Sequence, residues 1–123
     1  MANPNLVVVT EVYGDNTGGD INVATPGDLV TMLDNTETGT LYKVSSIHII
    51  NTSAATMLIT VGIGTTLIDN YICANLSIPS NETVVISDKT TPLYIKDTQK
   101  LFGTTPTTGS TELKFTINYD KLS

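Results

Sequence analysis

The chain has 123 residues, enough for one domain that buries roughly two-thirds of the surface exposed when unfolded. Threonine occurs 22 times, isoleucine 12 and valine 10, while tryptophan and arginine are absent, and this β-branched composition predicts β structure throughout. The net charge of −6 and the lack of any basic cluster argue against binding to a nucleic-acid backbone, which needs clustered lysine or arginine.

The first third of the chain carries the whole charge imbalance, because residues 1–39 hold six acidic residues and no lysine. Residues 6–12 form a short apolar run, which predicts a strand. Residues 13–28 contain four glycines, one proline and three aspartates, which predicts a loop or extended arm. Residues 29–33 predict a weak strand. Such a long connection is uncommon inside a compact domain, so we expect an acidic N-terminal arm (1–39) partly held by another subunit.

The remaining residues, 40–123, are expected to form the folded domain, organised around two apolar runs at 41–50 and 57–63. Six small or polar residues separate these runs, which predicts an antiparallel hairpin. Alternation fails in the first run at Ser45 and Ser46, and a β-bulge there would restore one core face. The residues that would then share this face are Tyr42, Val44, Ile47 and Ile49.

Five further strands are predicted, at residues 71–78, 83–87, 93–95, 100–102 and 112–120. The last of these alternates strictly, with Leu113, Phe115, Ile117 and Tyr119 pointing inward. About eight short strands with turn signals between them and no helical segment predict an all-β fold. We expect an antiparallel two-sheet β-sandwich, of jelly-roll or immunoglobulin-like type, with an extended N-terminal arm; a small barrel is the nearest alternative.

Motifs for catalysis or metal binding are weak. The single histidine, His48, is flanked by isoleucines, and the GIGTT run at residues 62–66 lacks the helix that follows a phosphate-binding loop. The DNTGGD run at residues 15–20 lacks the spacing of an EF-hand loop. The single cysteine, Cys73, lies in an apolar run and is expected to be a small buried hydrophobe. We therefore predict no enzyme activity, no metal and no cofactor.

The sequence pattern predicts neither a signal peptide nor a membrane span. The N-terminus lacks the basic segment of a signal peptide, and no apolar run approaches the about 18 residues of a membrane span. We therefore expect synthesis in a reducing cytoplasm and no membrane partner.

Residues 41–119 resemble a small β-sandwich module found in virion proteins of tailed bacteriophages. The matching segments are LYKVSSIHIINTSAA, MLITVGI, NLSIPSNETVVISDKTTPLYIKDTQKL and ELKFTINYD. The chain departs from the module at residues 97–100, where DTQK replaces the customary Gly-Asp turn. The resemblance covers about two-thirds of the chain and omits the acidic arm.

The resemblance implies a structural protein of the virion, made in the host cytoplasm. A free-standing module with an N-terminal extension is most similar to a capsid decoration (cement) protein, which binds the outer shell as a dimer or trimer and bridges capsid subunits. Its partners would be the major capsid protein or other virion proteins. Neck, tail, baseplate and fibre components are the alternatives, followed by a host-surface binding module with exposed aromatic residues.

The arm supplies the expected partner-binding residues. An apolar segment can add as a strand to the edge of another sheet. The acidic side chains either form a solvated surface that confers solubility or are steered onto a basic neighbour. The residues expected to contact the partner are Leu6, Val7, Val8, Val9, Tyr13, Asp15 and Asp20.

Overall fold

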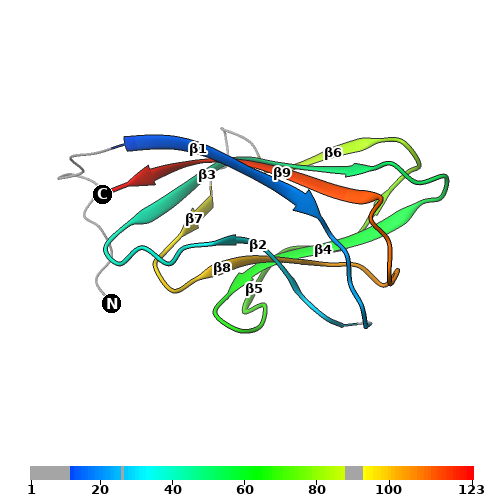
Figure 1. Cartoon of the computed structure of the whole chain (residues 1–123), viewed down its shortest axis with the longest axis horizontal. Helices are drawn as coiled ribbons and strands as arrows, with labels where there is room; N and C mark the ends of the chain where they lie inside the picture. Colours follow the sequence, from blue (N-terminus) through cyan, green and yellow to red (C-terminus); the bar gives the residue numbers. More distant parts are fainter. Residues whose placement is uncertain (1–11, 26, 88–92) are drawn as a thin grey trace.

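The computed structural model describes residues 12–25, 27–87 and 93–123. Within these ranges the chain forms nine strands and no helix, arranged as two antiparallel sheets packed face to face (Figure 1). The predicted β-sandwich is therefore confirmed. The strands are β1 (Val12–Asp20), β2 (Val30–Asp34), β3 (Leu41–Asn51), β4 (Met57–Gly64), β5 (Asn70–Ile78), β6 (Thr83–Ser87), β7 (Leu93–Ile95), β8 (Lys100–Thr104) and β9 (Leu113–Leu122).

Each sheet has a central pair of strands and two edges. In the first sheet the order is β1-β9-β3-β6, and β7 continues the β6 edge along the other half of β3. In the second sheet the order is β2-β8-β4-β5. The edges of the sandwich are therefore β1 and β6/β7 on one sheet, and β2 and β5 on the other.

Strands β3 and β4 do not form the predicted hairpin, and that prediction is wrong. Strand β3 pairs with β6, β7 and β9, whereas β4 pairs with β5 and β8 in the other sheet. Residues 52–56 therefore connect the two layers, as the right-hand end of Figure 1 shows. Two strands that each bury one face can either pair in a hairpin or lie in opposite sheets joined by a corner. The alternation of apolar residues is the same in both arrangements, so it could not distinguish them.

A buried asparagine holds this corner together. The side-chain nitrogen of Asn51 donates hydrogen bonds to the carbonyl oxygens of Ala55 (2.8 Å), Ile78 (2.9 Å) and Pro79 (3.3 Å). Its side-chain oxygen accepts hydrogen bonds from the backbone nitrogen (2.9 Å) and hydroxyl (2.6 Å) of Ser53. Asn51 and Ile78 are both fully buried, so the Asn51 amide satisfies an Ile78 carbonyl that water does not reach.

The predicted bulge in β3 and the core face of β9 are confirmed. The register between β3 and β9 shifts between Val44 and Ser46. Because of this extra residue, both halves of β3 turn the same face inward, and Tyr42, Val44, Ile47 and Ile49 are all buried. The inward residues of β9 are buried as well, namely Leu113, Phe115, Ile117 and Tyr119.

The predicted loop at residues 13–28 is wrong for residues 13–20. Strand β1 pairs with β9 without interruption from Val12 opposite Leu122 to Asp20 opposite Lys114. Beyond the strand, Ile21 and Val23 are buried. The described part of the expected arm therefore contains two edge strands, β1 in the first sheet and β2 in the second. Strand β2 confirms the strand predicted at residues 29–33. The strand predicted at 6–12 lies outside the described residues except for Val12.

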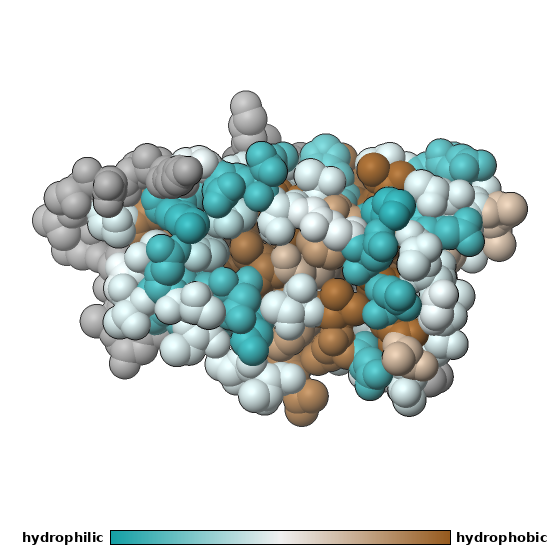
Figure 2. Space-filling model, viewed as in Figure 1, coloured by the Kyte–Doolittle hydropathy of each residue, from teal (hydrophilic) through white to brown (hydrophobic). Residues whose placement is uncertain are grey.

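Tertiary pairing explains why β1 forms despite its glycines and aspartates. Strand propensity reflects packing against a neighbouring strand more than any local backbone preference, and β9 supplies a long, regular neighbour. In addition, the ring of Phe115 lies against Gly19, where a Cβ would be 3.4 Å from two ring carbons. Strand β1 covers the core only in part, and apolar surface remains visible between the two layers in the middle of this face (Figure 2).

The turn at residues 96–99 contains a backbone conformation that favours glycine. Gln99 donates its backbone N–H to the Lys96 carbonyl (3.1 Å), and its side chain accepts the Lys96 N–H (3.0 Å). Thr98, the third residue of this turn, has a φ of 67°. A β-branched residue is strained in this left-handed region, where glycine is not.

We therefore expect Thr98→Gly to raise the free energy of unfolding by about 1 kcal/mol, because relief of the strain exceeds the added entropy of the unfolded chain. Urea denaturation would measure the shift in midpoint. Thr111→Gly is the control, because Thr111 is an exposed loop residue without positive φ, and there glycine should be neutral or destabilising. A loss of stability in Thr98→Gly comparable to that of the control would contradict the strain.

Candidate functional site

The predicted partner-binding residues fall into two groups. Leu6, Val7, Val8 and Val9 lie outside the described residues. Tyr13, Asp15 and Asp20 all lie in β1, with Tyr13 opposite Lys121 of β9. The described part of the predicted site is therefore one edge strand.

The two aspartates of β1 interact with β9. Asp20 forms an ion pair with Lys114 (2.7 Å), and both side chains are partly exposed. Asp15 accepts a hydrogen bond from the Tyr119 hydroxyl (3.3 Å) through one oxygen, and from the Asn16 N–H (2.8 Å) through the other. Exposed ion pairs contribute at most about 1 kcal/mol, so these contacts fix the register of β1 more than they stabilise the fold.

Tyr119, the partner of Asp15, stacks on a second tyrosine, Tyr42 of β3. The rings of Tyr42 and Tyr119 are 5.0 Å apart between centroids, and Tyr42 donates its hydroxyl hydrogen bond to Glu37. Lys121 pairs with Glu37 at 3.2 Å. Hydrogen bonds from Tyr42 and Lys121 hold the pKa of Glu37 below its usual value, while burial is the main cause that raises the pKa of both tyrosines. Both phenols therefore stay protonated near neutral pH and serve as packing and hydrogen-bonding groups.

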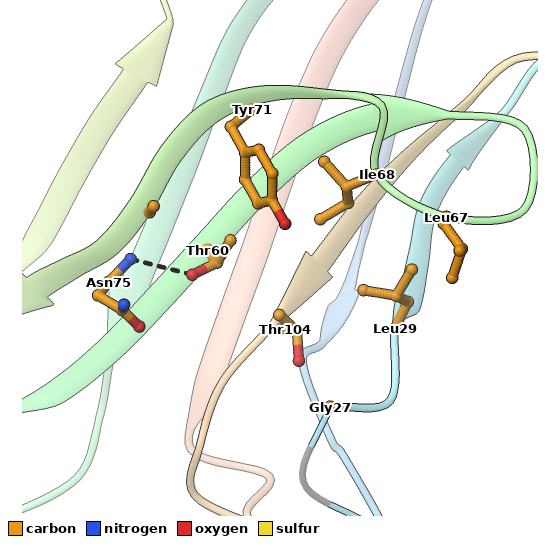
Figure 3. Close-up of a pocket in the computed structure, with 9 residues that line it drawn as sticks. Gly27, Leu29, Thr60, Leu67, Ile68, Tyr71, Asn75 and Thr104 are labelled. Carbon is orange, nitrogen blue, oxygen red and sulfur yellow. Dashed lines mark hydrogen bonds between the residues drawn. The ribbon is translucent and has the colours of Figure 1, made fainter.

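A groove of about 520 Å³ lies on the outer face of the second sheet (Figure 3). Thr60 of β4 and Thr104 of β8 are paired opposite each other and line it, and Tyr71 of β5 leans over it. Leu67 and Tyr71 are 69% and 65% exposed, which is high for large apolar side chains. The other lining residues are Gly27, Leu29, Ile68, Ala74 and Asn75.

Two glycines of β4 create one wall of this groove. A Cβ on Gly62 would overlap the Ile68 side chain, and a Cβ on Gly64 would overlap the Leu67 carbonyl. The connection between β4 and β5 can therefore fold back over the end of β4, which brings Leu67 and Ile68 to the groove. The sequence analysis did not predict this site. The signal for it was the apolar pair Leu67 and Ile68 in a short loop after Gly62 and Gly64.

The residues weighed for catalysis are dispersed. His48 is half-buried in β3, opposite Val85 of β6 and Thr116 of β9. Cys73 lies in β5, where burial raises the pKa of its thiol and thus disfavours the reactive thiolate. Among the described residues there is no group of three or more His, Cys, Asp or Glu side chains that could hold a metal ion, and no helix that could cross a membrane.

No protein-family model matches the chain, and no curated protein matches it. The functional assignment therefore depends on the resemblance of residues 41–119 and on the geometry described above.

Proposed function

We propose that the chain is a structural protein of a tailed-phage virion, and specifically a capsid decoration protein that binds the outer shell and bridges capsid subunits. The observation that carries the proposal is the resemblance of residues 41–119 to phage virion modules. These residues span β3 to β9, which include the central strands of both sheets. A neck, tail, baseplate or fibre position is the alternative within the same class.

The position of Val12 supports attachment through residues 1–11. Val12, the first described residue, lies opposite Leu122 near the C-terminal end of β9. Residues 1–11 include the apolar segment Leu6 to Val9. Eleven residues can span about 36 Å when extended, which is enough to reach a neighbouring subunit of a shell.

Stabilisation of a shell by such a protein follows from mass action. A ligand that binds the assembled state alone stabilises it by RT ln(1 + [L]/Kd), which is about 2.7 kcal/mol at one hundred times Kd. Many copies on one shell multiply this gain, so modest affinity at each site is sufficient.

Deletion of residues 2–10 tests this role. We expect the variant to keep β1 and the stability of the sandwich, while its occupancy on capsids of the encoding phage falls roughly tenfold or more, equivalent to at least about 1.4 kcal/mol of binding energy. Gel densitometry of purified particles would measure occupancy. Leu67→Ser is the matched control, because it removes an exposed apolar group in the connection between β4 and β5, on the other sheet's side of the molecule, and should leave occupancy unchanged. Full occupancy after the deletion would contradict attachment through this segment.

A second candidate function is recognition of a host surface, which the groove on the second sheet favours. An exposed tyrosine beside hydroxyl and amide groups is a suitable platform for a sugar ring, and Tyr71, Thr60 and Asn75 provide these groups. The Asn75 backbone N–H already donates to the Thr60 hydroxyl (2.9 Å), so this part of the groove is held in place before any ligand binds. A fibre position would use the groove, whereas a decoration protein would not need it.

A further inference from the structure

The four edges of the sandwich differ in how they are protected against pairing with another strand. Strand β2 carries a register shift, β5 carries two, and β6 and β7 are only five and three residues long. Strand β1 is nine residues long, pairs with β9 without any shift, and contains neither lysine nor proline. Natural proteins commonly protect exposed edges with bulges, short strands, proline or charged side chains, especially lysine. Of the edges in the described ranges, β1 alone is both long and free of register shifts, and its two aspartates, Asp15 and Asp20, are engaged by Tyr119 and Lys114 of β9.

The hydrogen-bonding groups on the free side of β1 can be assigned. The backbone nitrogen of Ile21 donates to Leu113 of β9 (2.7 Å), so odd-numbered residues of this segment direct their N–H groups toward β9. The Asn16 N–H donates instead to the neighbouring Asp15 side chain (2.8 Å), as expected for a group that points away from β9. The alternation therefore leaves the backbone groups of Gly14, Asn16 and Gly18 on the free edge. All three residues are exposed, and two of them have no side chain to block an approaching strand.

We propose that β1 pairs with β1 of a second copy of the chain, antiparallel and centred on Asn16, to form a two-fold symmetric dimer. Residues that lie opposite each other in an antiparallel pair point to the same face of the sheet. In a two-fold symmetric pair, the residue at the centre must therefore lie opposite its own copy, with the axis between the two. Centring on Asn16 is the register that engages all nine residues of the strand. The inference concerns the chain by itself and goes beyond the proposed virion role.

The charges of β1 suit this register. Asp15 would lie opposite Thr17 of the second copy, and Asp20 opposite Val12, so no carboxylate lies directly opposite another. A register centred on Asp15 would instead oppose two like charges, which is destabilising. Asp20 is also already paired with Lys114, which lowers the charge that the edge presents.

The centre of the interface contributes favourable contacts of its own. Asn16 would exchange backbone hydrogen bonds with Asn16 of the second copy, replacing its local bond to Asp15, and the two side-chain amides would lie side by side. Gly14 would lie opposite Gly18, where the two backbones can approach closely. Self-complementarity of this kind favours a second copy of the chain over an unrelated strand.

Sedimentation equilibrium of the full chain tests the dimer. We expect the wild-type chain to dimerise, and Asn16→Lys, which opposes two ammonium groups at the axis, to raise the dimer dissociation constant at least tenfold. Thr116→Lys is the matched control, because Thr116 is an exposed residue of β9, one strand inside the edge, and should leave the constant unchanged. Asn16→Pro removes the outward N–H without touching the β9 ladder and should weaken the dimer as well.

A wild-type chain that stays monomeric at millimolar concentration would overturn the dimer. So would equal dissociation constants for Asn16→Lys and Thr116→Lys, because the interface would then lie elsewhere. The experiment uses no capsid, so either result leaves the proposed virion role to its own test.

Discussion

Replacing Asn51 by alanine is expected to lower the free energy of unfolding by about 3 kcal/mol, because buried backbone groups would lose their partners. The Asn51 amide nitrogen serves three carbonyl oxygens, and its oxygen accepts two hydrogen bonds from Ser53. Ile78 is fully buried, so water cannot replace the lost donor at its carbonyl without opening the corner. Each buried polar group left unsatisfied costs about 1 to 3 kcal/mol.

Urea denaturation of Asn51→Ala and of a matched variant, Asn118→Ala, would measure this effect. Asn118 is exposed on β9 and donates one side-chain hydrogen bond to the Ser46 hydroxyl (2.9 Å), so its loss should cost under about 0.5 kcal/mol. Equal losses in the two variants would show that the corner between the sheets does not depend on Asn51.

Truncation of Phe115 to alanine is expected to cost about 3 to 5 kcal/mol, the range for loss of a buried aromatic ring. Phe115 is 6% exposed, belongs to the core between the sheets and also lies against Gly19 of β1. Its removal would therefore leave a cavity in the core and would take away the ring that packs against Gly19 of the edge strand.

The control for this variant is Thr116→Ala, on the neighbouring residue whose side chain is exposed. It should change the free energy of unfolding by less than about 0.5 kcal/mol. A loss below about 1 kcal/mol for Phe115→Ala would show that the ring is not an essential part of the core.

The elements predicted correctly from the sequence are those whose pattern is local. Strict alternation identified β9, and its interruption at Ser45 and Ser46 located the bulge of β3, because the side-chain period of a strand is two residues. Strand β1 could not be predicted in this way. Its glycines and aspartates have low strand propensity, and the strand exists because β9 lies beside it.

The candidate sites show the same limit. The acidic residues of β1 could be singled out from charge, but their pairing with Lys114 and Tyr119 joins residues about a hundred positions apart. The groove depends on the fold of the connection after Gly64, and the corner depends on Asn51 reaching Ile78 of β5. Contacts of this kind follow from the arrangement of the sheets, which alternation does not encode.

Hydrogen exchange, measured on the chain alone and again after mixing with capsids of the encoding phage that lack it, tests the proposed function most directly. A decoration protein attached through its N-terminal segment should show new protection in residues 2–10 on the shell, with the core strands β3 and β9 protected in both samples. No change anywhere would contradict binding to the shell. New protection confined to the groove around Tyr71 would contradict attachment through the N-terminal segment and place the binding site on the second sheet.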